Sequence, residues 1–246
     1  MPVFGRRRGA GGRDAVGESA ADLAAEAAAD ETSGAAPGAG PWDVAEPHPD
    51  IQRVDLGSLQ VPVLEGTDIQ LVFAEQHGAW VTVRHGLSEL QLQAFAAPKR
   101  DSLWDDVRAE IAAEISGAGG MVTERTGPFG AELQARVPAQ PGQPQAGTQL
   151  VRFTGVDGAR WFLRGVFSGA AAENPAAAAP LEAVMREVVV VRGEHPVPPR
   201  DLLELRLPPE AAAALEEQAK AQQEEQNRFA TPPNPFDRGP EITETR

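Results

Sequence analysis

Residues 153–167 read FTGVDGARWFLRGVF, and this stretch decides the fold, because its apolar residues alternate around the pair Asp157–Gly158. An Asp-Gly pair between two alternating apolar runs predicts a β-hairpin with a tight turn. The stretch also contains three of the nine Phe and one of the four Trp of the chain. Such a concentration of aromatic residues indicates that one face of the hairpin is buried in the core of an antiparallel sheet.

The register of this hairpin depends on the length of its loop. A two-residue Asp-Gly loop would place Leu163 opposite Arg152 and so mix a charge into an apolar face. A three-residue loop Val156–Gly158, with its glycine in the left-handed conformation of a G1 bulge, places Trp161 opposite Phe153 instead. Because a slip of one residue turns every side chain to the other face, we predict the three-residue loop.

The predicted register leaves Arg152, Arg160, Phe162 and Arg164 together on the outer face. Guanidinium groups bind phosphate or carboxylate, and a phenylalanine ring can stack on a base, so these four are the candidate ligand-binding residues. The alternative is structural: the arginine stems cover Phe162 while their charged ends pair with carboxylates such as Glu132 or Glu187. The sequence leaves both readings open.

Composition argues against several classes of function. The formal net charge is −14, and no basic stripe balances it, so nucleic-acid binding is not expected. The chain has no Cys, and its four His residues lack metal-ligand spacing, so we expect no metal and no cofactor. No nucleophile elbow and no phosphate-binding loop is found, so a non-catalytic protein is favoured over an enzyme.

The ends of the chain differ in composition from its middle. Residues 1–46 are rich in Ala, Gly and acidic residues, and residues 209–246 contain a Gln/Glu-rich run followed by prolines. Such segments cannot bury enough apolar surface, so we predict disordered tails, the second partly helical from Pro209 onward, around one domain at 47–208. That C-terminal helix is expected to be solvated or to depend on a partner. No apolar segment predicts a signal peptide or a membrane span, so the expected location is cytoplasmic.

Inside the domain, strands precede and follow two main helices. Alternating or β-branched runs predict strands at 69–73, 79–84, 90–95, 121–125, 131–137 and 188–191, besides the hairpin, and a last edge piece at 202–207. A helix is predicted after Ser102, which would form a capping box with Asp105, and a second helix at 181–187. This order predicts an α+β fold, in which helices pack on an antiparallel sheet.

Several motifs together resemble the actinobacterial domain-of-unknown-function family 3710. They include DLGSLQVP at 55–62, GPFG at 127–130 and RFTGVDGARWFLRG at 152–165, and the resemblance covers about 50–207. It implies no established activity, cofactor or catalytic residue. Members are often encoded near a dUTP diphosphatase and a small OB-fold protein, which associates the family with nucleotide or genome housekeeping. The element order is also similar to the PsbP-like and secretion-chaperone-like sandwiches, many of which are adaptors.

Two functions are therefore carried forward. The first is an adaptor that binds an unidentified protein partner through the sheet face and the tails, which predicts a shallow surface without a deep pocket. The second is a binder of a nucleotide or another small anion at the four candidate residues, which predicts a concave site.

Overall fold

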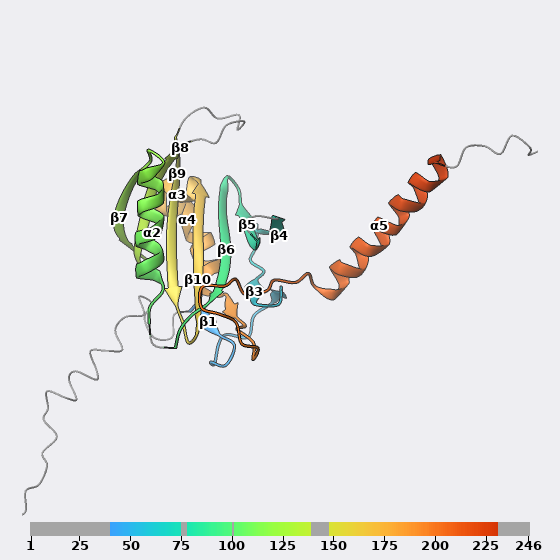
Figure 1. Cartoon of the computed structure of the whole chain (residues 1–246), viewed down its shortest axis with the longest axis horizontal. Coiled ribbons are helices and arrows are strands. Elements are labelled where there is room, and N and C mark those ends of the chain that lie inside the picture. The colour runs from blue at the N-terminus through green and yellow to red at the C-terminus, as the bar shows by residue number, and fades with distance from the viewer. Residues whose placement is uncertain (1–39, 75–77, 100, 139–147, 231–246) are drawn as a thin grey trace, which may run out of the picture.

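A computed structural model describes residues 40–74, 78–99, 101–138 and 148–230. It consists of a large antiparallel sheet with helices on both faces, and a smaller sheet at one end (Figure 1). The predicted α+β class is confirmed. Residues 1–39 and 231–246, which belong to the two tails predicted to be disordered, lie outside the described residues.

The large sheet has seven strands in the order β4-β5-β6-β10-β9-β8-β7. In that order the strands are Asp68–Ala74, Gly78–His85, Ser88–Ala96, Trp161–Gly169, Thr148–Asp157, Gly130–Pro138 and Met121–Gly127. Every neighbouring pair is antiparallel. The strands predicted at 69–73, 79–84 and 90–95 are β4, β5 and β6, and those predicted at 121–125 and 131–137 are β7 and β8, so all five are confirmed.

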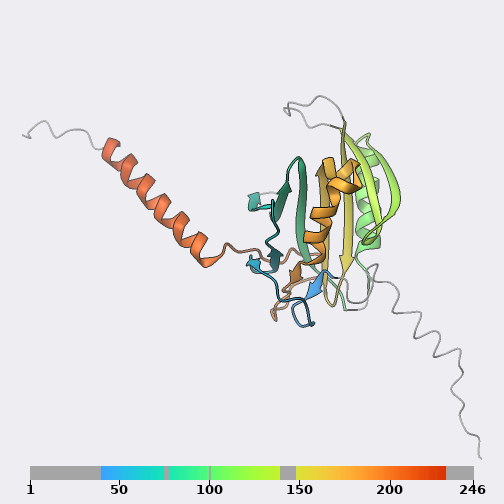
Figure 2. The same cartoon turned by 180° about the vertical axis from the view of Figure 1, so that it is seen from behind.

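Helices cover the two faces unequally. Helix α2 (Trp104–Gly117) lies chiefly over β7, β8 and β9. The short helix α3 (Ala170–Glu173) and helix α4 (Pro175–Arg186) lie on the opposite face, toward the viewer in Figure 2. The main hydrophobic core fills the space between α4 and the sheet. We call the two faces the α2 face and the α4 face.

Helix α4 begins six residues before the position predicted from the sequence, at Pro175 rather than Leu181. The Asn174 side chain caps it by accepting a hydrogen bond from the backbone of Ala176, and proline is well suited to the first helical position. Pro180 lies inside the helix despite the backbone hydrogen bond that it removes. The predicted packing through Leu181, Val184 and Met185 is confirmed, since all three are fully buried.

The smaller sheet has the order β1-β11-β3-β2, formed by Trp42–Asp43, Val189–Val190, Leu59–Pro62 and Arg53–Asp55. Residues 40–46 were assigned to the N-terminal tail, but β1 pairs in parallel with β11. In addition, the Trp161 indole donates a hydrogen bond of 2.7 Å to Asp43. The described fold therefore begins before residue 47.

The predicted register of the β9-β10 hairpin is wrong. Val156 is opposite Leu163 and Arg152 is opposite Phe167, and the chain reverses between Gly158 and Trp161 instead of at Val156–Gly158. The left-handed residue of the turn is Arg160, with φ of 72°, and not Gly158. Arg152 therefore shares the α4 face with Trp161 and Phe167 of β10, whereas Phe153 and Phe162 belong to the α2 face.

The chain after β11 differs from a regular strand. Leu202–Leu207, predicted as an edge piece, forms only two isolated bridges, Phe95 with Leu202 and Gly57 with Leu205. Helix α5 (Pro209–Ala230) then extends away from both sheets (Figures 1 and 2). Within the described residues no helix combines the length and apolar character needed to cross a bilayer.

Candidate functional site

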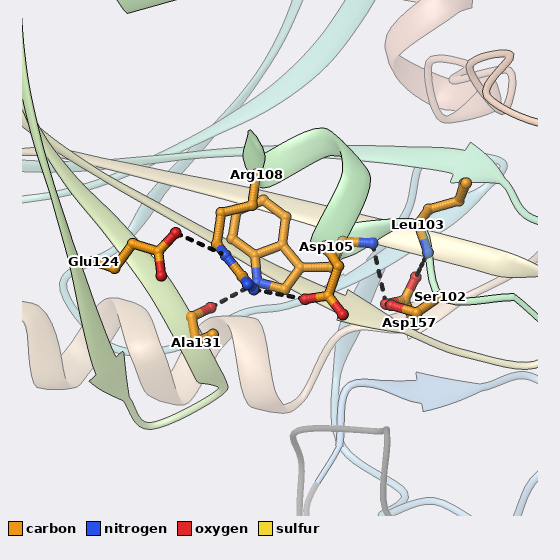
Figure 3. Close-up of polar contacts among 8 residues, drawn as sticks. Ser102, Leu103, Asp105, Arg108, Glu124, Ala131 and Asp157 are labelled. Atoms are coloured by element: carbon orange, nitrogen blue, oxygen red, sulfur yellow. Dashed lines mark hydrogen bonds and ion pairs between the residues drawn. The ribbon is translucent and has the colours of Figure 1, made fainter. Parts of the chain in front are cut away.

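The start of α2 is held by a residue of the distant hairpin, as Figure 3 shows. The Asp157 carboxylate accepts hydrogen bonds from the backbone of Leu103 at 2.8 Å and of Trp104 at 3.2 Å, and from the Ser102 hydroxyl at 2.6 Å. The predicted capping box is therefore wrong, because Asp105 pairs with Arg108 instead. Asp157 satisfies two of the N–H groups at the helix start and places a negative charge at the positive end of the helix.

Trp104, anchored in this way, covers the ring of Phe162, which the sequence predicted to lie on the outer face. Its indole donates a hydrogen bond of 2.6 Å to the Ala131 carbonyl and stacks on Phe162 with ring centroids 6.0 Å apart. Phe162 is 1% exposed. A Cβ on Gly155 would lie 2.4 Å from the indole, so only glycine allows this contact. One half of the α2 face is thus closed by packing.

Arg152, on the other face, belongs to a buried ionic cluster. Its guanidinium contacts Glu132 at 3.3 Å and Glu182 of α4 at 2.6 Å, and lies 4.2 Å from the centroid of the Phe167 ring. Pairing with Glu132 was the structural alternative considered from the sequence, and it is confirmed. Glu187, the other proposed partner, pairs instead with Arg53.

Burial has a direct electrostatic effect in this cluster. The loss of solvation raises the pKa of the Glu132 carboxyl, and the nearby charge of Arg152 opposes that rise. Glu132 and Arg152 are 3% and 8% exposed, so neither charge is well solvated in the folded protein. The two carboxylates balance the charge of Arg152, while its Nε, like that of Arg164, is buried without a hydrogen-bond partner among the described residues.

A pocket of about 270 Å³ opens on the other half of the α2 face, which α2 leaves uncovered. Strands β5, β6 and β10 and the segment after β11 contribute its lining, which consists of Trp80, Gln91, Gln93, Phe95, Arg164 and Leu202. Among the described residues that line the pocket, Arg164 is the only charged one. The small-anion hypothesis predicted a concave site at four residues, and of these four Arg164 lines this pocket.

Arg164 lies in this pocket without a carboxylate partner among the described residues. Its guanidinium donates a hydrogen bond to the Gln93 side-chain oxygen and lies 5.4 Å from the centroid of the Phe95 ring. Its Nε is buried and has no hydrogen-bond partner. Burial lowers the pKa of the guanidinium, but arginine remains charged at any physiological pH. The pocket therefore contains an incompletely compensated cation.

The wall formed by Leu202 comes from a segment that binds along the end of β6. Backbone hydrogen bonds join Arg200 to Ala96 at 2.8 Å and Leu203 to Ala94 at 2.9 Å. Arg200, whose φ is 74°, also pairs with Glu110 of α2 at 2.7 Å and with Asp106 at 3.3 Å. This segment therefore connects β6, which lines the pocket, to α2, which covers the other half of the face.

The structure does not bring the four predicted site residues together. Arg164 lines the pocket, Phe162 is buried under α2, Arg152 lies on the opposite face, and Arg160 is exposed in the turn. Sequence reasoning missed Trp80 and Leu202 as lining residues. The polar positions at 91 and 93 of an otherwise apolar strand were the available signal for the glutamines.

Comparison with known proteins gives the family and nothing more specific. The family model described as "Protein of unknown function (DUF3710)" matches residues 40–214. The chain belongs to this family. Searches of curated proteins and of solved structures found no match. In this DUF3710 chain, the matched range includes both sheets and every residue that lines the pocket. Within the described residues, no cluster of His, Asp or Glu could hold a metal ion.

Proposed function

We propose that this protein is a binding module whose ligand presents an anionic group to Arg164 in the pocket of the α2 face. The observation that carries the proposal is the buried guanidinium without a carboxylate partner in the described residues. Burying a charge without a counter-charge costs free energy in the unliganded protein. An anion bound at Arg164 would offset that cost.

The composition of the pocket supports a binding role. Trp80, Phe95 and Leu202 provide apolar surface, while Arg164 and two glutamines provide polar groups that can orient a ligand. A largely apolar concavity with a few polar groups is typical of small-molecule sites. The lining contains neither a nucleophile with an adjacent base nor paired carboxylates.

Action as a protein adaptor through the sheet face and the tails stays a prediction, and so does a cytoplasmic location. The adaptor hypothesis expected a shallow surface without a deep pocket, and the pocket of about 270 Å³ on the α2 face is open to solvent. A link to nucleotide or genome housekeeping also stays a prediction.

The test measures thermal stability and binding heats of the full chain with a panel of small anions, including acetate, benzoate, inorganic phosphate and uridine monophosphate. At least one anion is expected to raise Tm, because a ligand that binds only the folded state stabilises it. Arg164→Met should abolish that shift. Arg160→Met removes a cation of the same hairpin that does not line the pocket, so it should leave the shift unchanged. The proposal fails if no anion binds, or if Arg164→Met binds as tightly as the wild type.

A further inference from the structure

The pocket offers one positive charge and few other donors for an anion. Arg164 is its only charged residue, and the nearby acidic residue Glu89 accepts a hydrogen bond of 2.9 Å from the Gln91 side chain. A carboxylate carries a single charge and matches the two parallel N–H groups of a guanidinium. A phosphate monoester carries nearly two charges at neutral pH and has three acceptor oxygens.

The described residues that line the pocket do not include the start of a helix. Phosphate sites commonly use the free N–H groups at the start of a helix. Helix α2 lies beside the pocket, but the Asp157 carboxylate already accepts hydrogen bonds from the N–H groups of Leu103 and Trp104. The lining residues come from strands and from the segment around Leu202, not from a helix start. These observations favour a carboxylate over a phosphate.

The aromatic residues that line the pocket favour a ligand with a flat ring. The Trp80 indole N–H already donates to Thr82 at 3.1 Å, so the indole presents mainly carbon atoms to the pocket. Phe95 adds a second aromatic ring beside the guanidinium. Aromatic rings and guanidinium groups both stack on planar partners. A volume of about 270 Å³ lies just below the usual range of small-molecule sites, which favours a small ligand.

We propose that the ligand class of this pocket is the small aromatic or heteroaromatic carboxylate with one negative charge. The carboxylate pairs with Arg164 and the ring lies against Trp80 and Phe95. This inference rests on the proposed function, which requires only that some anion binds at Arg164. It further excludes nucleoside phosphates as the preferred ligands, because they bring more charge and more bulk than the lining accommodates.

The test is calorimetric titration of the full chain with a matched series of compounds. Benzoate is the reference, benzamide keeps the ring without the charge, cyclohexanecarboxylate keeps the charge without the flat ring, and phenyl phosphate replaces the carboxylate. Benzoate should bind at least about tenfold more tightly than benzamide, because a charge-assisted hydrogen bond is lost. It should also bind more tightly than the other two compounds.

Two variants separate the contributions of charge and ring. Arg164→Met should remove benzoate binding. Trp80→Leu should bring the affinities of benzoate and cyclohexanecarboxylate together while leaving a carboxylate preference over benzamide. Folding of each variant is checked by its thermal transition.

The outcomes distinguish this inference from the proposed function. If phenyl phosphate or uridine monophosphate binds more tightly than benzoate and depends on Arg164, the ligand class is wrong but the proposed function stands. Equal affinity for cyclohexanecarboxylate would exclude the flat ring. If no anion of either panel binds, both proposals are overturned.

Discussion

Arg152 and Arg164 lie on neighbouring strands of one hairpin, but they face opposite layers of the molecule. Arg152 meets two carboxylates, one from β8 and one from α4. Arg164 meets a glutamine oxygen and an aromatic ring, and no carboxylate within the described residues. Arginine thus has two roles in this hairpin. Arg152 stabilises the α4 face, whereas Arg164 on the α2 face is the residue proposed to bind a ligand. The difference arises from the layer that covers each face, because α4 contributes Glu182 whereas α2 is centred over other strands.

The largest expected effect comes from removing the compensated charge. Arg152→Met would leave Glu132 and Glu182 buried without their cation, so the free energy of unfolding should fall by about 3–5 kcal/mol. Urea denaturation measures this loss. Arg152→Lys, which keeps the charge without the planar fork, should lose less. A loss below about 1 kcal/mol for Arg152→Met would contradict a stabilising cluster on the α4 face.

A smaller loss is expected from the contact that closes half of the α2 face. In Gly155→Ala the added methyl would lie 2.4 Å from Trp104 and 2.7 Å from Phe162, so overpacking should cost about 1–3 kcal/mol. Gly117→Ala is the matched control, because its methyl meets nothing within 4 Å at the end of α2. A neutral Gly155→Ala variant would show that α2 does not pack closely on the sheet.

The opposite change in the free energy of unfolding is expected for Arg164, in the pocket of the α2 face. Arg164→Met replaces an incompletely compensated cation by an apolar side chain of similar length, so it should raise the free energy of unfolding by about 1 kcal/mol. Denaturation without ligand gives this value, to be compared with the loss in Arg152→Met. A destabilised Arg164→Met variant would show that the guanidinium has a structural role and would remove the contrast between the two arginines.

The pH dependence of stability should give the smallest and most gradual effect. Because the folded state raises the pKa of Glu132 above its ordinary value of 4.5, the folded state holds that proton more tightly than the unfolded state. Stability from this group is therefore present below pH 4.5 and declines as the pH rises toward the raised pKa. Glu132→Gln should lack this decline. The difference in unfolding free energy between the two proteins, measured from pH 4 to pH 8, tests the sign.

The regular elements could be predicted because their signals are local. Alternating apolar residues predicted the strands that form the meander β4-β5-β6 and the hairpin β7-β8, and Ser102 indicated the start of α2 to within two residues. The start of α4 was missed because two prolines indicate an irregular segment, whereas Asn174 and the buried positions 181, 184 and 185 stabilise the helix.

The candidate site was harder to predict because it depends on pairings across the chain. The hairpin register was chosen to keep Arg152 away from an apolar face, and nothing local reveals that Glu132 and Glu182 meet it there. Leu202 reaches the pocket from more than a hundred residues beyond Gln93. Arg164 was identified from the sequence because strand alternation alone places it on the face that points away from the main core.

Asp157 also has a consequence for the order of folding. The residue that caps α2 lies 54 positions after Leu103 and belongs to β9, next to the turn of the hairpin. The first turn of α2 therefore cannot gain its cap until β9 has been placed, so closure of a long loop precedes the final helix end. Amide protons at the start of α2 should become protected from hydrogen exchange together with those of β9 and β10, and later than those of the local β4-β5-β6 meander.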